Sequence, residues 1–348
     1  MDEALRGAEQ AVRALFDAFL DREPSEAELV HFTAKFESRA SILELIQSFY
    51  VCDEYTARRK SAGKLFVPPG HFYSPIVSPP EVTQRIPHVR PATQVRLPDV
   101  RLDLDEMTAF WESHLAPIAA RNSFPVEADD AFRYRFNNPA YSYADAIMLE
   151  AMILHFRPRH IIEVGSGWST ACILDVLARS NNMDTTLTCI EPFPSVLKEV
   201  LRPGDETRIR LIDKPVQSVD KTVFTGLGSN DILLIDSTHI VKTGSDVVFE
   251  LTEVLPVLKR GVVIHFHDIF YPFEYPYQWV VVENRSWNEI YALRNFLAFN
   301  NEFGVIFFND MFAQLREGVL RRDCPKFLLN PGGSLWLQRS PRQTAAGI

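Results

Sequence analysis

The sequence predicts an α/β protein built on a mostly parallel β-sheet and preceded by a small all-α module. From residue 160 onward, short apolar segments alternate with helical patterns, which is typical of a parallel sheet with helices on both faces. The first 60 residues instead show only the periodicity of amphipathic helices. The 348 residues are enough material for two or three domains.

Composition and charge are those of an ordinary globular protein, with 46% hydrophobic and 23% charged residues. The net charge of -9 argues against nucleic acid as the main partner, because phosphate binding requires a basic surface. No apolar run approaches the roughly 20 residues that cross a bilayer. The acidic start predicts an amphipathic helix, so we do not expect a signal peptide there. The four cysteines lack the paired spacing of a zinc site, so we expect reduced thiols and a cytoplasmic location.

Residues 1–60 predict a bundle of short helices. Pro24-Ser25 ends the first helix and begins the second, and Ser41 with Glu44 forms a capping box for a third. The motif formed by residues 20–24 together with Glu54-Tyr55 resembles a small helical module of unknown function that recurs in bacterial secreted and glycan-associated proteins. No residue in this module suggests chemistry, so we expect it to serve docking or homo-oligomeric assembly.

Residues 61–100 predict an irregular but ordered strap. Eight of the 23 prolines lie between Gly63 and Pro98, which excludes a continuous helix or a central strand. The consecutive aromatic residues of His71-Phe72-Tyr73 are unusual in a flexible linker, so we expect the strap to pack on another domain. The chain then continues with a third domain, residues 101–348, which begins with a predicted helix from Leu102 to about Ala120.

A second helix of this domain, from Ser142 to Phe156, leads into the strands. Seven strands are predicted: Ile161–Val164, Leu187–Ile190, Ile209–Ile212, Ile232–Ile235, Val262–Phe266, Val305–Phe308 and Leu335–Leu337. Helical patterns separate the first six, the clearest running from Ser245 to Leu258. No clear helix separates the last two, so we expect the seventh strand to be inserted antiparallel. This ending distinguishes the fold from a nicotinamide-binding Rossmann domain.

The first strand ends in a glycine-rich turn that suits a nucleotide-like ligand. Glu163-Val164-Gly165-Ser166-Gly167 leads into Ser169-Thr170 and a helix, and glycine lets a ligand approach the backbone. The second strand ends at Glu191, which is placed to accept two hydrogen bonds from a ribose diol. Phe193 follows and can lie against a flat base. Ligands of parallel sheets bind at these carboxyl ends of the strands.

These features resemble the class I S-adenosylmethionine-dependent methyltransferases, and the resemblance covers about residues 130 to 340. It implies that the glycine turn binds the methionyl and ribose parts of the cofactor and that Glu191 binds the ribose hydroxyls. It also implies that Glu163 organises the turn. The expected cofactor-binding residues are Glu163, Gly165, Ser166, Gly167, Ser169, Glu191 and Phe193.

Acidic residues and histidines follow the fourth and fifth strands, in Asp236-Ser237-Thr238-His239 and His265-Phe266-His267-Asp268. Carboxylate and imidazole at neighbouring strand ends are good ligands for a divalent cation. The arrangement resembles the cation-dependent O-methyltransferases of the catechol and macrolide-sugar types. That resemblance implies Asp236, His267 and Asp268 as metal ligands and His239 as general base.

His267 stands where those enzymes commonly have a carboxylate, which favours Mn or another transition ion over Mg. His265 is expected either to support a ligand or to replace one. A cation lowers the pKa of an alcohol, and a neutral imidazole can remove its proton.

We therefore expect metal-assisted methyl transfer from S-adenosylmethionine to a hydroxyl of a saccharide or other small molecule. The aromatic segment from Tyr271 to Trp279 could stack on that acceptor. Two alternatives stay open: an iron oxygenase with a two-histidine, one-carboxylate site, and a non-catalytic scaffold.

Overall fold

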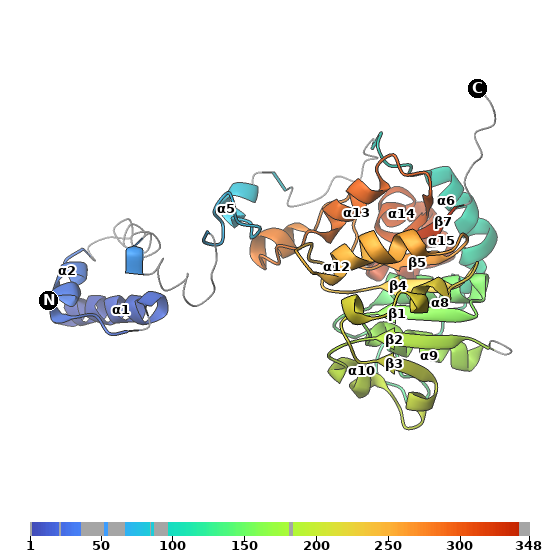
Figure 1. Cartoon of the computed structure of the whole chain (residues 1–348), viewed down its shortest axis with the longest axis horizontal. Coiled ribbons are helices and arrows are strands. Elements are labelled where there is room, and N and C mark those ends of the chain that lie inside the picture. Colours follow the sequence, from blue (N-terminus) through green and yellow to red (C-terminus); the bar gives the residue numbers. More distant parts are fainter. Residues whose placement is uncertain are drawn as a thin grey trace. The chain divides into compact units, whose positions relative to one another are not determined.

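The computed structural model describes residues 2–20, 22–35, 52–54, 67–83, 85, 86, 97–180 and 184–340. The chain forms two compact units, Met1–Arg85 and Ile86–Ile348, which are described separately (Figure 1). None of the helices in these ranges is both long and apolar enough to cross a lipid bilayer.

The first unit is helical over much of its described length, as the sequence predicts. Helices α1 (Asp2–Leu20) and α2 (Glu26–Thr33) share a small apolar core made by Val12, Phe16 and Leu20 of α1 and flanking side chains of α2. Ser25 caps α2, because its side chain accepts from the Glu28 amide while the Glu28 carboxylate accepts from the Ser25 amide.

A short helix, α5 (Pro79–Val82), lies in the proline-rich part of this unit. The capping box predicted at Ser41 and Glu44 lies outside the described residues. The roles predicted for residues 1–60 and 61–100, docking module and strap, stay predictions.

The second unit contains a seven-stranded sheet in the order β3-β2-β1-β4-β5-β7-β6. Its strands are β1 (His160–Val164), β2 (Thr186–Ile190), β3 (Ile209–Ile212), β4 (Ile232–Ile235), β5 (Val263–Phe266), β6 (Phe303–Phe308) and β7 (Leu335–Arg339). The first five strands pair in parallel, and β7 is inserted antiparallel between β5 and β6. The predicted fold class is confirmed.

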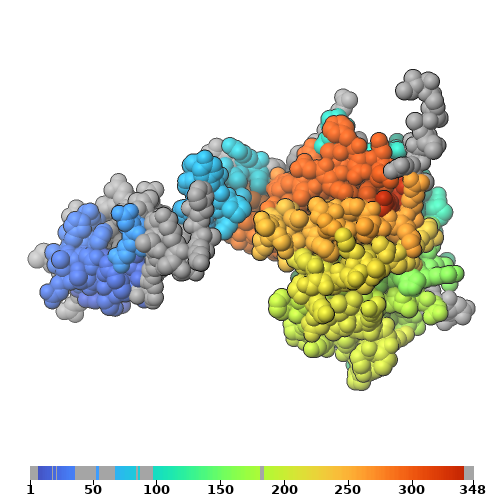
Figure 2. Space-filling model, viewed as in Figure 1, coloured from blue at the N-terminus to red at the C-terminus, as the bar shows by residue number. Residues whose placement is uncertain are grey.

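Helices cover this sheet: α6 (Leu104–Phe110), α7 (Ala116–Ala119), α8 (Tyr143–Phe156), α9 (Trp168–Arg179), α10 (Ser195–Val200), α11 (Thr222–Thr225), α12 (Asp246–Phe249), α13 (Glu289–Leu297), α14 (Asn309–Leu315) and α15 (Glu317–Asp323). Turns of π-helix or 3₁₀-helix add Trp111–Leu115, Asp205–Thr207, Val216–Ser218, Glu250–Val254, Leu255–Val257, Gln278–Val282 and Pro325–Leu329. In Figure 2 the segments of this unit, green to red, form one close-packed body.

One expectation was wrong: α14, α15 and a 3₁₀ turn do separate β6 from β7. Each of the two helices is only seven residues long, and Arg316 lies between them. Segments this short show too few turns for an apolar periodicity to stand out in the sequence.

The order of the strands fixes where a ligand can bind. β2 and β4 lie on opposite sides of β1, so the right-handed connections from β1 and from β4 leave the sheet on opposite faces. The sheet therefore has its switch point between β1 and β4, and ligands of such sheets bind beyond the carboxyl ends of the strands at this point. β4 and β5 are buried along their whole length, which explains why His265 is the only residue in the two strands that is not apolar.

The ends of β1 and β4 approach each other so closely that Gly165 must be glycine. Its φ is +79°, and a Cβ atom there would lie 1.8 Å from the carbonyl oxygen of Asp236. Gly167 is less constrained, because its backbone is extended and a Cβ would lie 3.1 Å from Val196 Cγ1. The first glycine is thus required by the contact between two strands, whatever a ligand requires in addition.

We predict that Gly165→Ala destabilises the protein more than a matched change at Gly204. Gly204 also has a positive φ, +95°, but a Cβ there would meet nothing within 4 Å. Gly204→Ala should therefore cost only the backbone strain, about 1–3 kcal/mol. Gly165→Ala should cost at least about 2 kcal/mol more, because the overlap forces β1 and β4 apart. Urea unfolding of both variants measures the difference, and equal losses would contradict the account of Gly165.

Candidate functional site

The turn after β1 is held by a buried hydrogen-bond relay. The Gly167 amide donates to Thr170 Oγ1 at 3.0 Å, and the Thr170 hydroxyl donates to Glu163 Oε2 at 2.5 Å. Glu163 and Thr170 are both fully buried, so the carboxylate at the end of β1 fixes the turn through the first turn of α9. Thr170 is therefore as much part of this arrangement as Glu163. Ser169 beside it is also buried.

Glu191 spans from the end of β2 to the glycine turn. One carboxylate oxygen accepts from the Ser166 amide at 3.2 Å and the other from the Phe193 amide at 2.7 Å. Each oxygen can accept a further hydrogen bond. The Ser166 hydroxyl is buried without a partner in the described part of the chain, and the Phe193 ring is 82% exposed. The turn thus offers unused polar atoms and an open aromatic face to a polar ligand with a flat ring.

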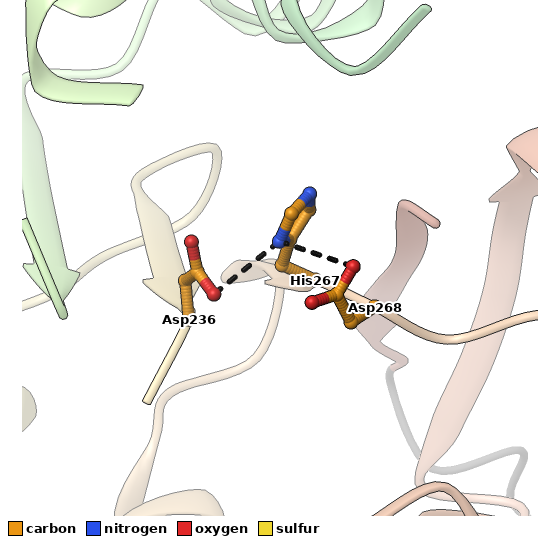
Figure 3. A group of neighbouring side chains, drawn as sticks. All are labelled: Asp236, His267 and Asp268. Atoms are coloured by element: carbon orange, nitrogen blue, oxygen red, sulfur yellow. Dashed lines mark hydrogen bonds and ion pairs between the residues drawn. The ribbon is translucent and has the colours of Figure 1, made fainter. Parts of the chain in front are cut away.

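Three side chains at the ends of β4 and β5 converge on one point (Figure 3). His267 Nδ1 lies 3.3 Å from Asp236 Oδ1 and 3.6 Å from Asp268 Oδ1. One ligand atom from each residue lies within 4.8 Å of the others. The His267 amide donates to the Ile235 carbonyl at 3.0 Å, so pairing between the strands sets this geometry. Two carboxylates and an imidazole form a donor set that fits a divalent transition ion.

The other nitrogen of His267 faces a carboxylate that the sequence analysis missed. His267 Nε2 lies 3.4 Å from Asp145 Oδ2, on the first turn of α8. Asp145 Oδ1 accepts from Ser334 Oγ at 2.6 Å, and that hydroxyl lies 2.9 Å from His265 Nε2. His265 is thus connected to His267 through Ser334 and Asp145 and is not part of the converging group.

His239 is held on three sides. Its carbonyl accepts from the amides of Asn288 and Glu289, each at 3.1 Å, and its Nδ1 lies 2.8 Å from Glu289 Oε2. The Trp287 ring lies against the imidazole, with 4.4 Å between ring centroids. The remaining nitrogen, Nε2, lies 3.5 Å from both Asp236 Oδ1 and Asp268 Oδ2. His239 therefore points its free nitrogen at the converging group.

Ion pairing between carboxylates and imidazoles outweighs burial in setting the pKa values of His239, His267 and Asp236. Burial alone would lower the pKa of His239, but hydrogen bonds with Asp236 and Glu289 outweigh it and raise the pKa to about 10. Burial likewise opposes a charged His267, yet Asp268 and Asp236 raise its pKa well above the usual range. Burial would raise the pKa of Asp236, but the two imidazoles lower it. The carboxylates thus stabilise positive charge at this point, which is also what a bound cation would supply.

The buried carboxyl group of Glu163 should make the stability of the protein depend on pH. Burial raises its pKa from the ordinary 4.5 to about 7, so the folded protein favours the protonated form. The stability from this preference is complete below pH 4.5 and is lost as the pH rises through 7. Between pH 5 and 8 we predict that the wild type loses about 2–3 kcal/mol of unfolding free energy relative to Glu163→Gln. Urea unfolding at each pH measures this difference. The exposed control Glu317→Gln should show the same change of unfolding free energy with pH as the wild type. If Glu163→Gln also showed the same change as the wild type, the prediction would be contradicted.

Comparison with known proteins identifies the domain that contains this site. Residues 162–269, from β1 to just beyond β5, match the family model described as a methyltransferase domain. An uncharacterized protein of Archaeoglobus fulgidus is 34% identical over 180 residues, which cover 50% of this chain and 78% of that protein.

Two solved structures show fold likeness at low identity. The O-methyltransferase TomG of Streptomyces achromogenes is 14% identical, covers 66% of this chain and 98% of its own, and has a TM-score of 0.39. The methyltransferase PaMTH1 of Podospora anserina is 15% identical, covers 68% and 88%, and has a TM-score of 0.35. Scores this low carry no inference about chemistry. By its sequence matches and its strand order, the chain belongs to one family with the archaeal protein and contains a class I S-adenosylmethionine-dependent methyltransferase domain.

Proposed function

We propose that this protein transfers a methyl group from S-adenosylmethionine to a hydroxyl of a saccharide or glycosylated acceptor, with the help of a divalent cation. One observation carries the proposal. A convergent group of two carboxylates and one imidazole lies beside the glycine turn, and His239 Nε2 lies 3.5 Å from both carboxylates. This combination supports a cation ligand set and a proton acceptor next to a bound methyl donor.

The cofactor would be held by the turn after β1 and by Glu191. The unused acceptor capacity of Glu191 and the unpartnered Ser166 hydroxyl suit ribose hydroxyls, and the exposed Phe193 ring suits the base. When bound, the cofactor supplies an electrophilic methyl group on a sulfonium. Because Gly165 touches the backbone of Asp236, this turn and the convergent group form one continuous site.

Asp236, His267 and Asp268 would hold the cation, which lowers the pKa of a hydroxyl that it contacts. The donor set includes an imidazole, so Mn or a similar transition ion suits it at least as well as Mg. Asp145 faces the outer nitrogen of His267, and such a carboxylate orients a metal-binding histidine and increases its basicity.

The acceptor is proposed from the aromatic residues beside His239. The Trp287 ring packs on His239, and the Arg285 guanidinium lies 3.9 Å above the Trp279 ring and 4.7 Å from the Trp287 ring. Aromatic faces next to a reacting group suit the C–H faces of sugar rings, which supports a saccharide as acceptor. The first unit would serve docking or homo-oligomeric assembly.

The iron-oxygenase alternative gains no support from the geometry. Such a site needs two histidines and one carboxylate around one ion. The group described within 4.8 Å contains one histidine, His267, and His265 contacts Ser334. A methyltransferase match over residues 162–269 also makes a non-catalytic scaffold the weaker hypothesis.

We predict that methyl transfer to saccharides requires the cation and His239 in different ways. With labelled S-adenosylmethionine and a panel of mono- and oligosaccharides, chelation should abolish turnover and Mn should restore it at least as well as Mg. His267→Ala should lose both bound Mn and turnover. His239→Ala should keep Mn while kcat falls by about 10²–10⁴-fold, the usual contribution of a positioned base.

Elemental analysis of the purified variants and single-turnover methyl transfer measure these outcomes. His160→Ala is the matched control, since His160 is half-exposed at the opposite end of β1 and should keep both properties. Full turnover in chelator would overturn the role of the metal. Loss of Mn from the His239 variant would make that residue a ligand in place of a base.

A further inference from the structure

We propose that Glu289 is a positioning residue, which fixes the orientation and the protonated nitrogen of His239 without touching the acceptor or the methyl donor. This inference rests on the proposed function, because it assigns to Glu289 a role that operates only through His239. Glu289 lies in no predicted motif. It is the first residue of α13, and the chain between β5 and α13 brings it to the end of β4.

Glu289 holds His239 through both its backbone and its side chain. The Glu289 amide donates to the His239 carbonyl at 3.1 Å, and Glu289 Oε2 lies 2.8 Å from His239 Nδ1. The imidazole therefore cannot turn about its Cβ–Cγ bond without breaking a short, buried hydrogen bond. The Trp287 ring, with its centroid 4.4 Å from that of the imidazole, limits the same rotation from one face. Both contacts keep Nε2 directed at Asp236 and Asp268.

A purely structural role does not account for a carboxylate in this place. The Glu289 side chain is 1% exposed, and its Oε1 has no partner within the described part of the chain. Burying a carboxylate with one oxygen unsatisfied costs free energy that an apolar side chain would not. A second buried carboxylate, Glu250, lies close enough to raise the cost further by repulsion. Burial raises the pKa of Glu289 above its usual value, and the hydrogen bond and charge of the His239 imidazole offset part of this cost.

The carboxylate also decides which nitrogen of His239 carries the hydrogen. An ionised carboxylate only accepts hydrogen bonds, so the hydrogen must lie on Nδ1. Asp236 and Asp268 favour a charged imidazole in the absence of a cation. With a cation held by these carboxylates, its charge would offset their effect, and a neutral His239 would present a lone pair at Nε2, the form a general base requires. In the proposed transfer, Nε2 would take the O–H proton of the acceptor as its oxygen bonds to the methyl carbon, and the electron pair of the broken C–S bond would stay on the sulfur of the donor. Glu289 would then face the resulting imidazolium.

A double-mutant cycle tests whether Glu289 acts through His239. Glu289→Gln keeps the size of the side chain and the backbone hydrogen bond, but its amide can donate to Nδ1 and so favour the wrong tautomer. We predict that it lowers the single-turnover rate by about 10–10³-fold while the KM for S-adenosylmethionine changes less than about twofold. Made in His239→Ala, the same change should alter the residual rate by less than about twofold, because the residue through which it acts is gone.

Each outcome decides a separate question. An equal loss from Glu289→Gln in both backgrounds would assign Glu289 a structural role and overturn this inference, leaving the proposed function intact. A wild-type rate in His239→Ala would instead overturn His239 as base, and with it the basis of the inference.

Exposed Glu253→Gln is the control for the change from carboxylate to amide and should leave the rate unaltered. Glu289→Asp, which keeps the charge but withdraws the oxygen from Nδ1, should be slow as well, and a wild-type rate there would contradict the positioning role. Thermal unfolding and Mn content verify that each variant is folded.

Discussion

The close contact between the ends of β1 and β4 is the constraint on which the site depends. A Cβ at Gly165 would overlap the carbonyl of Asp236, so the backbone of the glycine turn touches the backbone that presents a proposed metal ligand. This direct contact would allow one small site to hold both a methyl donor and the proposed cation, as in-line transfer between neighbouring groups requires.

Buried charge is the second feature that shapes the molecule. Asp145, Asp236, Asp268 and Glu289 face two imidazoles in a part of the sheet where β4 and β5 are fully buried. Isolated, each carboxylate would be costly there, and the histidines compensate them. The result is a group in which each ring nitrogen of His239 and His267 lies within 3.5 Å of a carboxylate oxygen. Such preorganisation is what a cation site and a general base both need.

The sequence predicts much of this arrangement, for reasons that differ from residue to residue. The ends of β4 and β5 can be predicted because their apolar runs stop at Asp236 and His267. Neighbouring strands of a parallel sheet bring such ends together. Asp145 and Glu289 could not be predicted, because each lies on a helix whose local pattern carries no sign of the strand end it meets. The role predicted for Gly165 in binding a ligand stays a prediction, and the structure adds a contact between strands as a second reason for glycine there.

The central claim is that one divalent cation binds between the ends of β4 and β5, next to the methyl donor. Anomalous diffraction at the manganese absorption edge, from crystals grown with Mn and S-adenosylhomocysteine, tests it most directly. The account predicts one strong peak at about 2.0–2.3 Å from a carboxylate oxygen of Asp236, a carboxylate oxygen of Asp268 and Nδ1 of His267. A difference map without a peak there, at a Mn concentration that supports turnover, would contradict it.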